Sequence, residues 1–388
     1  MARTTRRATS TLEQLLAAKE IVICCGSGGV GKTTTAAAAG AMAAAQLGGK
    51  VLVVTVDPAR RLANALGLES FGNVEHRVPD EAFTAAGIDC QGELWAAMLD
   101  TKQSWDDLVR RHAPDAATRD AILTNPLYAN ITGRFVQSHD YIAMERLYEI
   151  HASGRYDLVI VDTPPTRNAL DFLEAPERMA DFFSSRLLRW LTVPYRSRLV
   201  SMATKPFYKV ADTILGSAFL EDIAEFFLLF QTMYDGFVER ARAVQRILED
   251  KRTTFLVVST LESAPLREAE FFMSALEERG FHLGAVVLNK VLPSYLLDAE
   301  AADAASRLGA DPAAAAAALD GLGDADAVAR VVGEISHSFL NFRVVASREA
   351  EQRKELARVP DVLATVPYFA SDIHDLAGLV RLGEQIWR

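Results

Sequence analysis

Residues 26–34 carry the clearest chemistry in this sequence. They read Gly-Ser-Gly-Gly-Val-Gly-Lys-Thr-Thr and fit the pattern G-x-x-x-x-G-K-[ST]. In this pattern the glycines let backbone N–H groups approach phosphate oxygens, the lysine supplies a positive charge and the hydroxyl after it can bind Mg²⁺. The run therefore predicts a site for the phosphates of a nucleotide and for Mg²⁺. Its residues are Gly26, Ser27, Gly28, Gly29, Val30, Gly31, Lys32, Thr33 and Thr34.

The segments on either side of this loop are those that a phosphate site needs. The apolar run 21–24 before it predicts a buried strand, and the Ala-rich stretch 34–47 after it predicts a helix. The loop would then lie at a helix N-terminus, where free N–H groups and the helix dipole attract anions. The alternative is a glycine-rich turn with an incidental lysine, and the agreement of strand, spacing and helix argues against it.

Two carboxylates follow other apolar runs that predict buried strands. Asp57 comes directly after residues 51–56, and Asp162 ends the run 158–162. Ligands of open parallel sheets bind beyond the carboxyl ends of the strands, so both side chains should lie near the phosphate loop. Asp162 then suits the carboxylate in the Mg²⁺ shell of a P-loop ATPase, with an N-cap or turn role as the alternative.

The whole chain of 388 residues alternates strand and helix patterns, which predicts an α/β fold. We expect a P-loop NTPase with a mostly parallel central sheet flanked by helices, plus an α-helical subdomain. Four ranges describe the expected organisation: a flexible basic tail (1–18), a core (19–175 and 249–388, with a helical excursion at about 101–153) and an amphipathic helical insert (176–248). Within the core, the Ala- and Asp-rich stretch 300–334 predicts a weakly packed surface excursion.

The insert 176–248 is rich in aromatic residues and methionine. Two interpretations remain open: these side chains are the interior of a helical subdomain, or some of them form a plastic apolar groove for a hydrophobic helix of another protein. Charged residues interrupt every apolar run, so the insert is not expected to span a membrane.

Charge and cysteine content indicate which partners and which cellular location to expect. The chain has a net charge of −10, which argues against a nucleic-acid partner. Its three cysteines, Cys24, Cys25 and Cys90, are typical of core thiols in a reducing compartment, and we expect a cytoplasmic protein. Residues 1–10 are basic without an apolar segment; a disordered tail is one interpretation and an organelle transit peptide the other.

The order of the motifs resembles the ATPases of arsenite pumps and of tail-anchored protein targeting, the ArsA-like family. The resemblance rests on the loop, on Asp57-Pro58-Ala59, on Asp162-Thr163-Pro164-Pro165-Thr166, on Val287-Leu288-Asn289 and on Val366-Pro367. It implies a nucleotide-dependent dimer whose two sites face each other.

The resemblance also implies a role for individual residues. Asp57 would orient the attacking water, and Lys32 would neutralise charge on the transferred phosphate. Thr33 and Asp162 would hold Mg²⁺. Asn289, Pro367 and Tyr368 would frame adenine, and ATP is favoured over GTP because Leu292 stands where a guanine site has Asp. The implied activity is Mg²⁺-dependent ATP hydrolysis that rearranges a helical subdomain, which binds a hydrophobic protein client or a membrane protein.

Three departures from the family pattern matter. Ser27 replaces a lysine that in the family reaches across the dimer. The chain has no C-x-x-C pair, so a zinc-stapled dimer is not expected, and its three cysteines offer no arsenite cluster. The partner is then either a second copy, with Arg60, Arg61 or Arg167 in place of the lysine, or a paralogous ATPase that retains it. A hydrolysis-impaired subunit and a MinD- or ParA-like positioning ATPase are the alternatives.

Overall fold

The computed structural model describes residues 11–56, 63, 65–66, 68, 72–128, 136–164, 174–175, 178, 181, 225–319, 323–356, 360–369 and 371–387. Several sequence-based expectations therefore lie outside the described residues. They concern the catalytic Asp57, the three arginines proposed to replace a lysine, residues 1–10, and almost all of the range 176–224.

A central sheet confirms the predicted α/β class. Within the described residues the strand order is β3-β4-β2-β5-β1-β6-β7-β8, and every neighbouring pair is parallel except β3–β4. The strands are β1 (Ile21–Cys25), β2 (Lys50–Thr55), β3 (His76–Arg77), β4 (Glu93–Met98), β5 (Leu158–Asp162), β6 (Thr253–Ser259), β7 (Leu283–Val291) and β8 (Val362–Pro367). β1 lies between β5 and β6, so the loop that follows it opens at the centre of the carboxyl edge.

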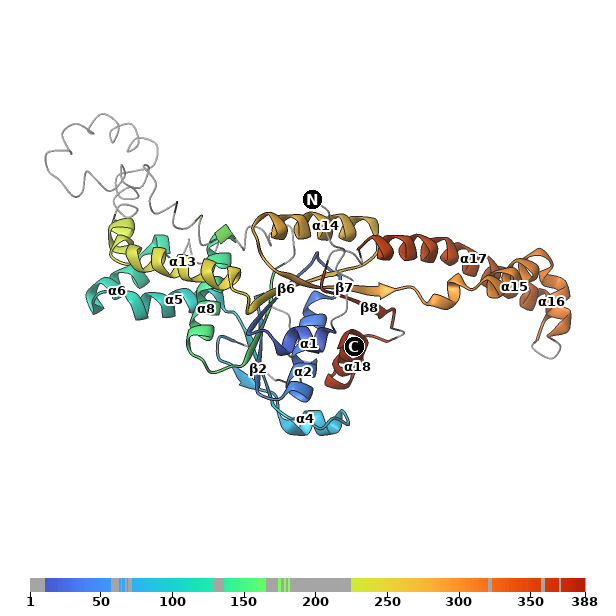
Figure 1. The fold of residues 1–388 in the computed structure, drawn as a ribbon, viewed down its shortest axis with the longest axis horizontal. Helices are drawn as coiled ribbons and strands as arrows, with labels where there is room; N and C mark the ends of the chain where they lie inside the picture. The colour runs from blue at the N-terminus through green and yellow to red at the C-terminus, as the bar shows by residue number, and fades with distance from the viewer. Residues whose placement is uncertain are drawn as a thin grey trace, which may run out of the picture.

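Helices cover both faces of the sheet (Figure 1). One face packs against α1 (Leu12–Ala17), α2 (Lys32–Leu47), α4 (Asp80–Ala85) and α18 (Leu376–Trp387). The other packs against α5 (Thr101–His112), α6 (Ala116–Thr124), α8 (Val136–Ala152), α13 (Tyr234–Glu249) and α14 (Ser263–Glu278). Cys24 and Cys25 belong to the cores on opposite faces, as neighbours in a strand must.

The helix α2 packs closely on the sheet at Gly40, and its buried residues are mostly small. Its alanines from Ala36 to Ala45 are at most 3% exposed. A Cβ on Gly40 would lie 2.4 Å from Val53 Cγ2, so only glycine allows this approach. The close packing fixes the helix that begins at the phosphate loop.

The α1 segment differs from the flexible tail expected for residues 1–18. Residues 12–17 form a helix whose Leu12 and Leu16 are buried on the sheet. Thr11 and Gln14 form a capping box at its N-terminus, which satisfies two backbone donors. The sequence composition did not predict this helix, because the helix has only six residues and follows a basic segment.

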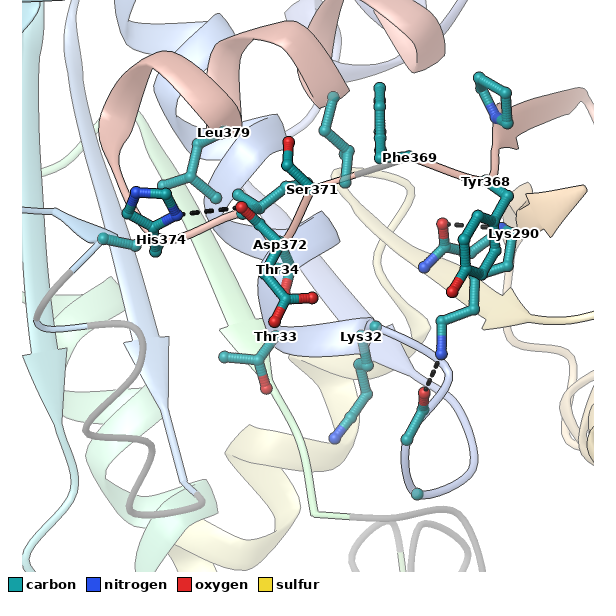
Figure 2. A pocket seen from close by; sticks show the side chains of 18 of the residues that line it. Lys32, Thr33, Thr34, Lys290, Tyr368, Phe369, Ser371, Asp372, His374 and Leu379 are labelled. Carbon is teal, nitrogen blue, oxygen red and sulfur yellow. Dashed lines mark hydrogen bonds between the residues drawn. The ribbon is translucent and has the colours of Figure 1, made fainter. Parts of the chain in front are cut away.

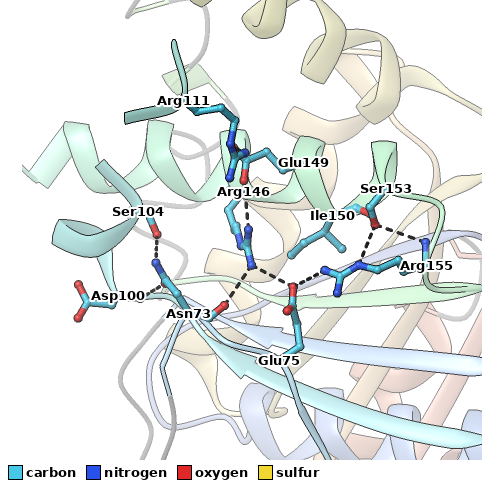
Figure 3. Close-up of polar contacts among 10 residues, drawn as sticks. All are labelled: Asn73, Glu75, Asp100, Ser104, Arg111, Arg146, Glu149, Ile150, Ser153 and Arg155. Atoms are coloured by element: carbon cyan, nitrogen blue, oxygen red, sulfur yellow. Dashed lines mark hydrogen bonds and ion pairs between the residues drawn. The ribbon is translucent and has the colours of Figure 1, made fainter. Parts of the chain in front are cut away.

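A polar network ties the second helical face to the edge of the sheet (Figure 3). Glu75 Oε1 accepts hydrogen bonds from Arg146 Nη2 at 2.9 Å and from Arg155 Nη2 at 2.8 Å. Asn73 donates to Ser104 Oγ at 2.8 Å. These contacts join the segment before β3 to α5, to α8 and to the turn before β5, so the expected helical excursion of 101–153 is fixed against the core.

The chain leaves the sheet after β7 in a long helical arm and returns to it at β8 (Figure 1). The arm, residues 294–356, consists of the 3₁₀ helix η2 (Ser294–Leu297), α15 (Ala299–Ala310), α16 (Pro312–Ala318) and α17 (Ala325–Leu356). It agrees with the predicted surface excursion but extends 22 residues beyond the predicted end at 334, because α17 has 32 residues. None of the helices in the described part of the chain is both long enough and apolar enough to cross a membrane.

Candidate nucleotide-binding site

The phosphate loop connects β1 to α2 as its sequence predicts. Gly31 caps α2 with φ 92°, and Gly29 has φ 81°, so both adopt backbone conformations that favour glycine. A Cβ on Gly31 would also lie 2.3 Å from Asn289 Nδ2. The loop therefore presents its backbone, with no side-chain cap, at the positive end of a helix, which is an arrangement suited to phosphate.

Lys32, Thr33 and Asp162 meet at the start of α2. Lys32 Nζ donates a hydrogen bond to the carbonyl of Thr163 and lies 3.4 Å from Asp162 Oδ1. Thr33 Oγ1 donates to Asp162 Oδ2 at 2.6 Å, and Thr55 Oγ1 donates to the same oxygen at 3.0 Å. The predicted neighbourhood of Thr33 and Asp162 is thus present in the structure.

The carboxylate of Asp162 is fully buried, and it fits a hard cation. Burial raises the pKa of its carboxyl above the usual value, against the opposing effects of Lys32, Thr33 and Thr55. Its Oδ1 is buried and accepts no hydrogen bond from the described residues. Because Mg²⁺ prefers carboxylate and hydroxyl oxygens, a buried carboxylate with a free lone pair beside a threonine hydroxyl suits this ion.

Another part of the cavity wall comes from β7 and from the end of β8. Asn289 is buried near the end of β7; its Nδ2 donates to the carbonyl of Val30 at 2.8 Å, and its Oδ1 accepts from Lys290 N at 2.9 Å. Tyr368 N donates to the carbonyl of Val291 at 3.1 Å, which holds the end of β8 against β7. Asn289 is therefore hydrogen-bonded to the phosphate loop and helps to hold it in place. The sequence did not indicate this structural role.

These elements enclose a cavity of about 660 Å³ (Figure 2). The cavity brings together most of the predicted site residues: Ser27, Gly28, Gly29, Gly31, Lys32, Thr33, Thr34, Asn289, Pro367 and Tyr368. Gly26 and Val30 belong to the loop but do not line it, since both are buried beneath. Asp162 lies under Thr33, and the strand leading to Asp57 ends beside it, where Thr55 pairs with Asp162.

Sequence reasoning missed a second group of lining residues. Lys290 has φ 58°, a left-handed conformation that is uncommon outside glycine, and its Nζ lies 3.3 Å from the carbonyl of Gly29. Phe369, Asp372 and His374 line the cavity from the segment that leads to α18. Only Lys290 carried a signal, its position directly after Asn289; the others follow β8 without a recognisable pattern.

Ser27 occupies the position where the sequence departs from the resembling family. Its hydroxyl is buried and makes no hydrogen bond with the described residues. It supplies no positive charge to the cavity that it lines. Within the described lining the cationic side chains are Lys32 and Lys290.

A parallel sheet with a glycine-rich loop at the carboxyl end of its central strand and a Thr33–Asp162 pair below it defines a P-loop NTPase fold. A family model described as anion-transporting ATPase matches residues 19–308. The chain therefore belongs to the anion-transporting ATPase family.

Curated relatives agree with this assignment. The chain is 26% identical over 262 residues to putative arsenical pump-driving ATPase 1 of Aquifex aeolicus, which covers 66% of this chain and 59% of the relative. It is 24% identical to putative arsenical pump-driving ATPase 2 of the same organism, over 64% of this chain and 73% of the relative. A putative arsenical pump-driving ATPase of Chlorobaculum tepidum is 22% identical over 64% of this chain and 55% of the relative. The matched segment thus spans between about half and three quarters of these proteins.

Proposed function

We propose that this chain is a Mg²⁺-dependent ATPase whose hydrolysis cycle changes the arrangement of its helical regions. The observation that carries the proposal is the cavity at the carboxyl edge of the sheet. Its wall brings together the phosphate loop and Asn289, Pro367 and Tyr368, and Thr33 in that wall is hydrogen-bonded to the Asp162 carboxylate beneath it. Membership of an ATPase family supports the same activity.

In this proposal each residue of the site has a separate role. Backbone N–H groups of the loop bind phosphate oxygens, and Lys32 exchanges its contacts with Thr163 and Asp162 for the β- and γ-phosphates. Thr33 and Asp162 hold Mg²⁺, which neutralises charge on the phosphates when bound. Asp57 orients the attacking water. Phosphoryl transfer depends mainly on such positioning and charge neutralisation.

Adenine is the base that the site residues suit. In this proposal Asn289, Pro367 and Tyr368 frame the base, with the Tyr368 ring, 65% exposed, free to pack on it. The residue three positions after Asn289 is Leu292, whereas a guanine site would place a carboxylate there to pair with the guanine edge. ATP is therefore the expected nucleotide.

The proposed hydrolysis cycle acts on partner proteins. A dimer with facing sites would close on ATP, and either a second copy or a paralogue that retains the loop lysine would complete the site opposite Ser27. A hydrophobic protein client or a membrane protein would bind the helical region. We propose a cytoplasmic location and no nucleic-acid partner, in line with the net charge of −10.

A hydrolysis-impaired role is the second candidate, and Ser27 favours it. Without the cross-dimer lysine, developing negative charge has one fewer partner in the site. The curated relatives are named as ATPases that drive arsenical pumps, but a thiolate site for arsenic fits this chain poorly. Cys24 and Cys25 lie on opposite faces of the sheet, and burial raises the pKa of the Cys25 thiol to about 12, so thiolates do not converge on one ion.

Calorimetry with nucleotide tests the proposal. We expect Mg·ATP to bind at least tenfold more tightly than Mg·GTP, and Lys32→Ala to abolish most of the ATP affinity. Lys50→Ala is the matched control, because Lys50 is the first residue of β2 and therefore lies at the amino ends of the parallel strands, away from the phosphate loop. Equal dissociation constants for ATP and GTP would overturn the adenine assignment, and unchanged ATP binding by Lys32→Ala would overturn the site.

A further inference from the structure

The end of β7 carries an irregularity in its pairing with β8. Leu288 pairs with Thr365, and Val291 pairs with Pro367. Three steps along β7 therefore match two steps along β8, so β7 accommodates one extra residue in a β-bulge. Bulges are rare between parallel strands, and beside functional sites they redirect a side chain. This bulge lies at residues 289–290, which line the nucleotide cavity.

Lys290 has a backbone conformation that costs free energy for a residue with a side chain. Its φ is 58°, and among the residues that the structure describes it is the one residue other than glycine with a positive φ. In this conformation Cβ lies too close to the following carbonyl oxygen, so glycine is the residue that usually adopts it. Such strain persists where the surrounding structure enforces it, and functional sites are the common place. A lysine at this position therefore indicates a use for its side chain.

The bulge turns the Lys290 side chain toward the phosphate loop. Along β7 the side chains alternate between the two faces of the sheet: Val287 belongs to the core on the α2 face, and Leu288 belongs to the core on the opposite face. Strict alternation would place Asn289 on the side of Val287 and Lys290 on the side of Leu288. The left-handed residue breaks this alternation, and Figure 2 shows the Lys290 side chain extending from β7 to the loop.

Two consecutive carbonyl groups of the loop are held by neighbouring side chains of the bulge. The Gly29 carbonyl accepts a hydrogen bond from Lys290 Nζ at 3.3 Å. The Val30 carbonyl accepts one from Asn289 Nδ2 at 2.8 Å. The backbone N–H of Lys290 donates to Asn289 Oδ1 at 2.9 Å, which fixes the orientation of that amide. The bend at Lys290 therefore sets both contacts with the loop.

These contacts determine where N–H groups of the loop point. In a planar trans peptide the C=O and N–H groups point in opposite directions. The carbonyls of Gly29 and Val30 point toward the side chains from β7, so the N–H groups of the same two peptides, on Val30 and Gly31, point away from them. At the N-terminus of a helix, N–H groups that are oriented in this way bind phosphate oxygens.

We propose that Lys290 is a positioning residue of the nucleotide site, whose ammonium group holds the phosphate loop with its N–H groups oriented toward phosphate. The proposal rests on the proposed nucleotide-binding function. Asn289 holds the peptide between residues 30 and 31, and Lys290 extends this hold to the preceding peptide. Because the donor is charged, the contact is stronger than one between neutral groups. No other side chain of the described lining donates to the Gly29 carbonyl.

Calorimetry with Mg·tripolyphosphate and Mg·ATP on the full chain tests this role. Lys290→Gly keeps the left-handed backbone and removes the amine, so its melting temperature should equal or exceed that of the parent. Its affinity for both ligands should fall by the same factor, about tenfold. Lys290→Asn should behave in the same way, because asparagine also tolerates this backbone conformation. Lys290→Arg should retain most of the affinity, because a guanidinium group also donates to a carbonyl.

Hydrogen exchange of the nucleotide-free protein separates a hold on the loop from direct contact with phosphate. The segment 27–31 should exchange about threefold faster or more in Lys290→Gly than in the parent, because one of its two anchors is lost. Lys354→Ala is the matched control for a lost surface charge: Lys354 is exposed on α17 and does not line the cavity, so affinity and exchange should stay at parental values.

Each other result would overturn the proposal. Parental affinities in Lys290→Gly would show that the loop does not need the lysine, and a loss confined to ATP would assign Lys290 to the base. A loss for both ligands with unchanged exchange would show direct contact between the ammonium group and phosphate. If the parent bound neither ligand, the proposed nucleotide-binding function would fail, and hydrogen exchange would still show whether Lys290 holds the loop.

Discussion

At the scale of single residues, the site depends on polar atoms that are buried and have specific partners. Asp162 joins the loop, α2 and β2 through Thr33 and Thr55. Asn289 does the same on the other side of the loop by donating to the carbonyl of Val30. A buried carbonyl that loses its donor costs about 1–3 kcal/mol, so both contacts help to preset the loop for phosphate.

Asn289→Ala tests whether this residue supports the loop, reads the base, or does both. If its amide supports the loop, the affinity for Mg·tripolyphosphate should fall together with that for Mg·ATP, by roughly tenfold for about 1–2 kcal/mol. Calorimetry with both ligands measures this. Tyr368→Ala is the comparison, because it should weaken ATP and leave tripolyphosphate unchanged. A loss confined to ATP in the Asn289 variant would assign Asn289 to the base alone.

Asp57→Asn tests the proposed orientation of the attacking water. The change should preserve ATP affinity and lower the turnover number by roughly 10² or more, because such a carboxylate acts mainly in the transition state. Single-turnover hydrolysis with bound ATP measures the step directly. Hydrolysis at the parental rate would contradict the proposed role of Asp57.

At the scale of elements, the position of α2 decides where the loop presents its N–H groups. The helix lies against β2 so closely that Gly40 meets Val53 without room for a methyl group. Its alanines give high helix propensity and also a smooth buried face. Propensity and packing therefore act together at the element that begins with Lys32.

Gly40→Ala should destabilise the protein although alanine favours helices. The expected gain of about 0.5–1 kcal/mol from helix propensity is outweighed by overpacking, which typically costs about 1–3 kcal/mol. Denaturant unfolding measures the change. In the control Gly333→Ala, on α17, the nearest atom would lie at an ordinary 3.4 Å, so this variant should be as stable as the parent or more so. A stabilised Gly40→Ala variant would show that α2 can move away from the sheet.

At the scale of the whole molecule, the nucleotide site and the arm share the segment that follows β7. Asn289 and Lys290 contact the loop, and η2 begins the arm four residues after Lys290. Glu349 on α17 accepts a hydrogen bond from Leu292 N. A short, hydrogen-bonded stretch of chain therefore connects the residues that contact the phosphate loop to the arm.

Ser27→Lys tests whether the missing loop lysine limits the activity of a dimer. We expect the turnover number of the isolated chain to rise at least tenfold, because a preorganised cation near the phosphates commonly contributes 10²–10³. Ser27→Ala should leave turnover within about twofold. Steady-state hydrolysis at several protein concentrations measures both variants. Unchanged turnover in the Ser27→Lys variant would mean that other cations serve the site, and a paralogous partner would then be unnecessary.

The sequence by itself determined the loop, the strands before it and at Asp162, and the α/β class. These features follow from local rules: glycine spacing, the apolar run of a buried strand, and the propensity of an Ala-rich helix. That Asn289, Pro367 and Tyr368 frame adenine stays a prediction from the resemblance to a family; the structure places all three at the cavity that the phosphate loop lines.

Only the tertiary structure decided how distant segments meet. The strand order places β7 two strands from β1, which lets Asn289 hold the carbonyl of Val30 across 259 positions of sequence. The same order brings Lys290 and the segment after β8 to the cavity and buries α1 on the sheet. It also leaves large apolar side chains of α17 exposed within the part of the chain that the structure describes. Apolar periodicity says that a helix has an apolar side, but what covers that side depends on which elements fold against it, and this is a property of the whole chain.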